Sequence, residues 1–413
     1  MRIATSQLYT TSVSNMESQQ SQLLQIEQQI SSGVALTNPA DDPLGAAEAV
    51  QLSATSATLS QYATNQNTAL SSLQTEDSTL QSITTTLQSA NSLMQEAAGG
   101  TLNNTNDTAL AQQLEGYRNQ LLSLANTTDG QGNYIFSGFQ STSQVFSTNS
   151  AGAVTYNGDS GQRLVQVSST RQIAVGDTGS SVFMSVPSVG SAQVPAGNAN
   201  NTGTGTIGPV TVTNSTASTN NDNYSISFSD ATGTLQYTVT DNSQPSPGNV
   251  VGPTAYTAGS AISLGSGMNV TISGTPASGD SFSVTPGSAS TNSNIFQTLD
   301  NVINALNTPS QGNTAASANL TNALTTGMTA LSNSLNNVIT IHASVGGREQ
   351  EVTALQSVTS TSALQTTTNL SNLTSTDMTS AISQYTQLEN ALTASQKSFA
   401  TTQGLSLFQY INP

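Results

Sequence analysis

Apolar side chains recur at helical spacing near both ends of the chain. The N-terminal set comprises Met16, Leu23, Ile26 and Ile30, at intervals of seven, three and four residues. The C-terminal set recurs mostly at threes and fours and comprises Met378, Ile382, Tyr385, Leu388, Leu392 and Phe399. Such intervals place side chains on one face of a helix. We therefore expect a helix at each terminus, and we expect the two helices to pack against each other.

The clearest heptad pattern covers residues 44–98. In one register, eleven of the fourteen a and d positions are apolar, whereas the chain's 35% apolar content would give about five. These positions are Leu52, Thr55, Leu59, Tyr62, Gln66, Ala69, Leu73, Glu76, Leu80, Ile83, Leu87, Ala90, Met94 and Ala97. The pattern predicts one long helix that ends at Gly99-Gly100.

Capping residues mark where these helices begin and end. Gly33 follows Ser31-Ser32 and suits the left-handed conformation that terminates a helix. Asp41 or Asp42 is suited to cap the next helix, and Pro43 fits its first turn. Asp107 is the expected cap of a further helix, whose apolar pattern stops at Asp129-Gly130.

The middle of the chain changes from helical spacing to alternation with period two. Short apolar runs between Gly, Asn and Asp clusters predict strands at 134–136, 145–146, 163–167, 172–175, 224–228, 235–239 and 282–284. Gly203 to Gly208 spells G-x-G-x-x-G, but it precedes the strand-like Val210-Thr211-Val212 instead of a helix. The dinucleotide-binding interpretation therefore fails its required context.

Helical spacing returns after the strands. Ile295 to Leu306 predicts a helix that ends before Pro309, and a second seam runs from Leu324 through His342 and Val345 towards Phe399. The expected fold is α+β: an elongated rod of long, coiled-coil-like antiparallel helices from both chain ends, with an inserted all-β domain of one or two modules. Its expected domains are a terminal helical region disordered in the monomer (1–40 and 365–413), a helical-bundle core (41–140 and 290–364) and a β-rich outer domain (141–289).

Composition excludes several classes of function. Charged residues form 7% of the 413-residue chain, compared with about 25% in average soluble proteins, and the net charge is −16. This charge argues against nucleic-acid binding and against an anionic membrane surface. No apolar run is long enough for membrane insertion, and the first 30 residues lack the apolar core of a cleavable signal peptide.

Candidate catalytic chemistry is sparse. The chain has no cysteine, which removes disulfides, thiolate metal sites and thiol nucleophiles. His342 is the single histidine, and it occupies a seam position without clustered carboxylates. Asp41 and Asp42 are explained by helix capping. We therefore expect no enzyme activity, catalytic residue, cofactor or metal.

Several motifs resemble those of the bacterial flagellin superfamily. Ile30-Ser31-Ser32-Gly33, followed by Asn38-Pro39-Ala40-Asp41-Asp42-Pro43, resembles its N-terminal signature. Asn133 to Gly138 is similar to the segment where its core helices give way to the β domain. Tyr156-Asn157-Gly158-Asp159 with Arg163, and the ending Gly404 to Tyr410, resemble the hook–filament junction members instead of flagellins proper. Val34-Ala35 departs from the pattern, because the family usually has a basic residue there.

The resemblance implies a structural role at the hook–filament junction of the flagellum. Implied partners are other copies of the chain in a head-to-tail ring, the other hook–filament junction protein, flagellin and a type III export chaperone at the C-terminal region. The implied location is extracellular, after export without a cleavable signal peptide. A flagellin-like filament subunit is the alternative; an unrelated adhesin or an enzyme in the β region is weaker.

The termini carry the expected assembly contacts. The predicted interface comprises Ile3, Leu8, Met16, Leu23, Ile26, Ile30, Met378, Ile382, Tyr385, Leu392, Phe399, Leu405, Leu407 and Phe408. The family-motif loop comprises Asn38, Pro39, Asp41, Asp42 and Pro43.

Overall fold

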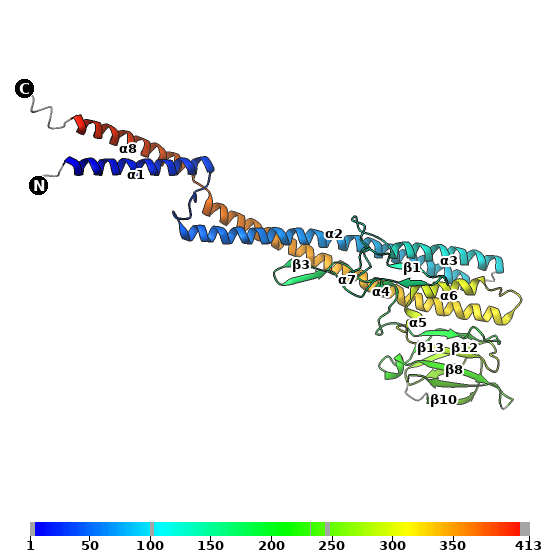
Figure 1. Ribbon diagram of the computed structural model, residues 1–413. Coiled ribbons are helices and arrows are strands. Elements are labelled where there is room, and N and C mark those ends of the chain that lie inside the picture. The colour runs from blue at the N-terminus through cyan, green and yellow to red at the C-terminus, as the bar shows by residue number, and fades with distance from the viewer. Residues whose placement is uncertain (1–4, 100–102, 232, 244–247, 405–413) are drawn as a thin grey trace, which may run out of the picture. The chain divides into compact units, whose positions relative to one another are not determined.

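The computed structural model describes residues 5–99, 103–231, 233–243 and 248–404. These residues form two compact units: a terminal unit within 1–64 and 355–413, and a central unit of 65–354. Long helices come from both ends of the chain, and a β domain lies between them in sequence (Figure 1). This confirms the expected α+β class with an inserted all-β domain.

The terminal unit is helical. It contains α1 (Thr5–Ser32), α8 (Met378–Gly404), the start of α2 (Pro43–Gly99) and the end of α7 (Thr314–Thr374). Gly33 has φ +70° and its N–H donates to Gln29 O at 2.9 Å, as expected of a residue that ends a helix. Asp42 caps α2, because its Oδ1 accepts the Gly45 N–H at 3.0 Å.

The long heptad seam was predicted correctly over most of its length. Every a and d position from Gln66 to Ala97 is buried, including Leu73, Leu80 and Leu87 at 0% exposure. The earlier positions differ: Leu52, Leu59 and Tyr62 are half-buried and Thr55 is exposed. The packed core of α2 therefore lies in the central unit.

The expected cap of α3 (Asn104–Ala125) was wrong. Asn103 is the capping residue, with its side chain accepting the Asn106 N–H at 2.9 Å. The helix begins earlier than the apolar pattern indicated. Asp107 consequently lies inside the first turn, buried, with its carboxylate 3.5 Å from the Ser310 hydroxyl.

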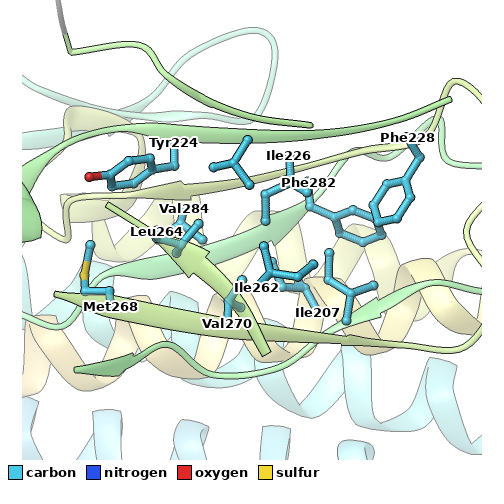
Figure 2. Packing of buried hydrophobic residues seen from close by; sticks show 12 residues of the cluster. Ile207, Tyr224, Ile226, Phe228, Ile262, Leu264, Met268, Val270, Phe282 and Val284 are labelled. Carbon is cyan, nitrogen blue, oxygen red and sulfur yellow. The ribbon is translucent and has the colours of Figure 1, made fainter. Parts of the chain in front are cut away.

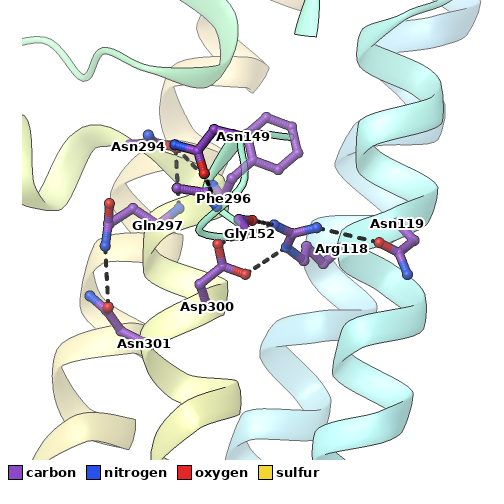
Figure 3. A network of polar contacts seen from close by, with 10 residues as sticks. Arg118, Asn119, Asn149, Gly152, Asn294, Phe296, Gln297, Asp300 and Asn301 are labelled. Atoms are coloured by element: carbon purple, nitrogen blue, oxygen red, sulfur yellow. Dashed lines mark hydrogen bonds and ion pairs between the residues drawn. The ribbon is translucent and has the colours of Figure 1, made fainter. Parts of the chain in front are cut away.

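An ion pair joins α3 to α6 (Ile295–Asn307). Arg118 Nε lies 2.5 Å from Asp300 Oδ1, and Arg118 Nη2 donates to Asp300 Oδ2 at 3.2 Å and to Gly152 O at 2.7 Å (Figure 3). The arginine side chain is 10% exposed. One guanidinium thus connects two helices and the loop at Gly152.

Residues 127–186 pack on the helices through aromatic rings. Phe146 and Phe183 have ring centroids 5.2 Å apart, and Phe183 stacks on Phe296 of α6 at 5.8 Å. The local elements are β1 (Phe146–Thr148) with β2 (Val154–Tyr156), β3 (Leu164–Ser168) with β4 (Arg171–Ala174), and α4 (Gly179–Phe183). The strand expected at 134–136 is absent from this described segment, because Ile135 to Gly138 are buried consecutively in a turn and do not alternate.

The inserted β domain is a sandwich of two antiparallel sheets. One has the order β10-β9-β8-β13-β5, and the other has β11-β12-β6 with β7 paired to β12. The bounds are β5 (Val194–Gly197), β6 (Thr206–Ile207), β7 (Thr211–Val212), β8 (Tyr224–Ser229), β9 (Gln236–Asp241), β10 (Gly248–Ala255), β11 (Ala261–Leu264), β12 (Met268–Ser273) and β13 (Ser281–Thr285), with a 3-10 turn at Ser218–Asn221. The strand-like run after Gly208 is therefore confirmed.

Alternating side chains fill the space between the sheets. Tyr224, Ile226 and Phe228 of β8 face the same core as Met268 and Val270 of β12 (Figure 2). Their burial alternates along β8 and β12, which is the period-two pattern of the sequence. The edge strand β10 carries two register shifts and a proline, devices that discourage pairing with another chain.

Amide side chains on one face of α7 attach the β domain to the helices. Asn322 accepts the Ile207 N–H at 2.8 Å and donates to Gly205 O at 3.0 Å. Asn333 makes the same two-way contact with Ala192, at 2.8 and 2.7 Å. Spacings of three, four and seven place the residues that contact the β domain on one helix face: Asn319, Asn322, Thr326 and Asn333. Asn337 continues this face and donates to Ser181 O of α4. A short helix, α5 (Ser290–Ser293), then leads from β13 into α6.

Candidate assembly surface

Helices α1 and α8 lie side by side in the terminal unit and run antiparallel (Figure 1). The rings of Tyr9 and Phe399 are in contact, with centroids 5.2 Å apart. The packing expected between the two ends of the chain is therefore present. Among the described side chains of these two helices, Ala381 alone is buried, at 6% exposure.

The predicted interface residues lie along this helix pair, but the pair does not cover them. Seven of them are half-buried: Met16, Leu23, Ile26, Ile30, Tyr385, Leu392 and Phe399. Met378 is 42% exposed and Ile382 is 52% exposed. Ile3, Leu405, Leu407 and Phe408 lie outside the described residues, as does the side chain of Leu8. The structure thus leaves a long apolar stripe partly open to solvent.

Sequence periodicity missed further exposed apolar residues in the same unit. Nine of the fifteen large apolar side chains exposed in the described chain belong to it. The additional ones are Tyr9, Leu24, Val34, Leu44, Val50, Val358 and Leu364. Tyr9 lies seven residues before Met16 and continues the seam of α1, so this spacing was its available signal. The other six stand outside the seam positions. Clustering of this kind is typical of surfaces that bind other proteins.

The two chain connections beside the helix pair are bonded to each other. Val34 and Ser375 form an isolated antiparallel bridge, with Ala35 N–H donating to Thr374 O at 2.7 Å and Thr376 N–H donating to Gly33 O at 3.0 Å. These hydrogen bonds therefore hold the connection between α1 and α2 beside the connection between α7 and α8.

The family-motif loop has a structural role in the chain itself. Asn38, Pro39, Asp41, Asp42 and Pro43 are all exposed. The side chain of Asn38 accepts the Ala40 N–H at 3.1 Å. The backbone carbonyl of Asn38 accepts the Asp41 N–H at 3.0 Å. The loop is thus an ordered turn that delivers Asp42 to the start of α2.

A buried carboxylate holds the loop after β4 against α2 and α7. Glu76 is 1% exposed, and its Oε1 accepts the Asp177 N–H at 2.8 Å. Burial, and then the nearby charge of Asp177, raise the pKa of Glu76 from 4.5 to about 7. Arg348 of α7 pairs with Asp177 and donates to Ala174 O at 3.0 Å. Burial of this carboxylate therefore favours its protonated form in the folded chain.

The described residues contain no group of three or more side chains suited to holding a metal ion. His342 lies 2.8 Å from Asp77, joining α7 to α2. Within the described ranges, none of the helices has the length and apolar character needed to cross a membrane.

Comparison with known proteins identifies the family. Residues 3–141 match the bacterial flagellin N-terminal helical region, and residues 196–286 match the D2-like domain of flagellar hook-associated protein 1. Over 409 residues, the chain is 30% identical to flagellar hook-associated protein 3 of Salmonella typhimurium strain LT2, with 99% of each chain covered. The chain belongs to the flagellar hook-associated protein 3 family. The recognised resemblance to the junction branch of the flagellin superfamily is thereby confirmed.

Solved structures agree with this assignment. Hook-associated protein 3 from Legionella pneumophila is 29% identical, with a TM-score of 0.70 over 78% of this chain and 98% of that one. The flagellar junction protein FlgL of Legionella pneumophila is 28% identical, with a TM-score of 0.67 over 79% and 99% of the two chains. The chain is a structural flagellar protein of the junction type and not a filament subunit, and its relatives are not enzymes.

Proposed function

We propose that the chain joins the hook to the flagellin filament as a ring of copies between the other hook–filament junction protein and flagellin. The single observation that supports this role best is the open apolar stripe on α1 and α8 of a chain from this family. Subunits that add head to tail use two different surfaces, and such contacts produce rings or helical tubes.

Folding of the terminal helices is coupled to assembly in this proposal. Among its described side chains the pair has one that is buried, whereas the seam of α2 in the central unit is fully buried. Helices in water owe most of their stability to the packing of an apolar face. The ends at 1–40 and 365–413 are therefore disordered in the free monomer and become helical once neighbouring copies cover the stripe. The helical core (41–140 and 290–364) and the outer domain (141–289) fold without neighbours.

Export precedes assembly. The chain leaves the cell through the flagellar type III channel as a largely unfolded polypeptide, without a cleavable signal peptide. Its C-terminal apolar stripe is covered until then by an export chaperone. Low charge and the absence of cysteine suit refolding outside the cell without oxidation.

Immunogold electron microscopy on intact cells tests the location. An antibody against residues 193–285 is expected to label one spot between hook and filament. Label along the whole filament, or none on the flagellum, would contradict the proposal. Cells lacking the protein provide the control for antibody specificity.

A further inference from the structure

A buried carboxylate interrupts the apolar seam of α2. Glu76 occupies a seam position between Leu73 and Leu80, which are both 0% exposed, and is itself 1% exposed. Its Oε1 accepts the Asp177 N–H at 2.8 Å, whereas its buried Oε2 has no hydrogen-bond partner among the described residues. An ionised carboxylate without water needs donors at both oxygens. The site therefore stabilises a charged Glu76 poorly.

Asp177 connects this carboxylate to α7 and to both ends of the β3–β4 hairpin. Its side chain pairs with Arg348 of α7 and accepts the Gln162 Nε2 at 3.0 Å. Arg348 also donates to the carbonyl of Ala174, the last residue of β4, at 3.0 Å. The next residue after Asp177, Thr178, is the N-cap of α4. The loop from β4 to α4 is thus held to both long helices at one residue.

Glu76, Asp177 and Arg348 form a carboxylate cluster in which two acidic groups share one guanidinium. Burial, and then the charge of Asp177, raise the pKa of Glu76 from 4.5 to about 7, although the charge of Arg348 lowers it. A proton on Glu76 allows a hydrogen bond to the Asp177 side chain. Loss of that proton leaves two like charges side by side in a site closed to water.

Two neighbouring groups of charges lie outside the carboxylate cluster. Asp77 of α2 lies 2.8 Å from His342 of α7, and burial and the charge of Asp77 raise the pKa of Glu349. Arg171 of β4 pairs with Glu351 of α7 at 2.5 Å. The charges that act on the buried carboxylate are those inside the cluster. The cluster is therefore electrostatically distinct from these pairs.

The backbone on both sides of the Asp177–Arg348 pair is easily deformed. Gly346 and Gly347 lie in α7 directly before Arg348, and a Cβ at either position would meet no atom within 4 Å outside the helix's own backbone. Packing therefore does not require glycine there, and two adjacent glycines weaken a helix locally. Gly176 precedes Asp177 in the loop. The contact can thus open without unfolding the rest of α7.

We propose that the carboxylate cluster is a proton-operated latch: residues 175–178 are closed on α2 and α7 while Glu76 carries a proton, and they open locally when the proton is lost. The closed loop holds a proton that a solvated Glu76 releases, so opening becomes easier as pH rises from 4.5 to 7 and is then constant. The latch needs no neighbouring copy, so it stands or falls independently of the proposed function.

Cysteine labelling of the full-length protein tests the latch. The chain has no cysteine, so Val175→Cys places a single thiol in the loop at a position that is 7% exposed. Its rate of alkylation by iodoacetamide is divided by the rate for a short peptide with the same thiol, which removes the pH dependence of the reaction itself. The normalised rate should rise on the order of 30-fold between pH 5.5 and pH 8, as pKa values of 4.5 and about 7 imply.

Two variants show whether the opening is local and whether Glu76 controls it. Glu76→Gln in the Val175→Cys chain keeps the shape of the side chain without its charge and should abolish the rise. Val338→Cys makes the same substitution at a position of α7 that is 0% exposed. It should react at least tenfold more slowly at both pH values, because a larger unfolding event is needed to expose it. Equal rates at the two positions, or a rise that survives Glu76→Gln, would overturn the latch.

The neighbouring histidine needs its own control, since histidine side chains also change charge near neutral pH. His342→Gln in the Val175→Cys chain should keep the rise. Loss of the rise in this variant would assign the switch to the Asp77–His342 pair and overturn the proposal.

NMR provides a check that needs no substitution. The Asp177 amide donates to Glu76 Oε1, so its chemical shift should change with a midpoint near pH 7. A constant Asp177 amide shift between pH 5.5 and pH 8 would show that Glu76 does not titrate in this range, which also overturns the latch.

Discussion

Tyr9 and Phe399 come from opposite ends of the chain, yet their ring centroids lie 5.2 Å apart at an interplanar angle of 48°. This contact places the start of α1 beside the end of α8. An aromatic pair contributes about 0.5–1.5 kcal/mol beyond the area it buries. These helices have 28 and 27 residues, and one of their described side chains is buried. They need more stabilisation than the aromatic pair provides, which is why we propose that neighbouring copies cover them.

Charges placed on the stripe are expected to block assembly without unfolding the core. In the variant Leu23→Asp/Leu392→Asp, both changed side chains are half-buried in the single chain and would be covered fully in the assembly. We expect swimming to be lost while the melting temperature of the purified protein stays within about 2 °C. The matched control, Gln22→Asp/Gln387→Asp, changes exposed neighbours on the same helices. Equal loss of swimming in both variants would count against the stripe.

The attachment of the β domain depends on Asn322. Asn322→Ala leaves the buried Ile207 N–H and Gly205 O without their partner, and we expect a loss of about 2–4 kcal/mol in the free energy of unfolding. Asn336→Ala, at an exposed position of α7, is the control. Urea unfolding measures both, and hydrogen exchange should show faster exchange at Ile207 in the first variant only. Matching values for the two variants would rule out this role.

The pKa of Glu76 predicts a stability that falls as pH rises. Its folded-state pKa is about 7 against 4.5 for the usual group, so the folded chain holds a proton that the unfolded chain has released. The stabilisation of the folded chain by this proton is about 3 kcal/mol in total. It is complete below pH 4.5, declines between pH 4.5 and 7, and is lost above pH 7. Glu76→Gln should remove this slope and be more stable than the native chain at pH 8. Glu96→Gln, on the exposed face of α2, should leave the slope intact when both are followed by urea unfolding.

Replacing Arg118 alone should lower the free energy of unfolding more than replacing both Arg118 and Asp300. Arg118→Ala leaves Asp300 and Gly152 O without their donor, and we expect a loss of about 3–5 kcal/mol in the free energy of unfolding. The double variant Arg118→Ala/Asp300→Ala should recover part of it, because no charge is then left alone. A double-mutant cycle by thermal unfolding gives the coupling, and strictly additive losses would show that the pair is not a unit.

The helices were predictable because their signals are local. Leu73, Leu80, Leu87 and Met94 repeat at sevens, and the buried seam follows them. Gly33 and Asp42 ended and began helices as expected, since capping needs one residue and its neighbours. The prediction that Asp107 caps α3 was wrong, because Asn103 is an equally suitable capping residue four positions earlier. The position of the first apolar residue does not distinguish the two.

The contacts between distant segments were not predictable. Asn322 and Asn333 look like ordinary polar residues of a helix, and only the folded chain brings them to Ile207 and Ala192. Glu76 stands at a seam position that was recognised, but its partner Asp177 lies 101 residues away in the sequence. The assembly stripe was proposed from periodicity and family resemblance; its exposure fits that proposal, and the contacts themselves stay a prediction.

Limited proteolysis tests the coupling of folding to assembly most directly. Purified monomer and detached flagella are treated with proteinase K under the same conditions, and the fragments are identified by mass spectrometry. We expect the monomer to lose both ends and leave a core of residues 41–364, whereas the chain in flagella stays intact. Protection of both termini in the free monomer would contradict it.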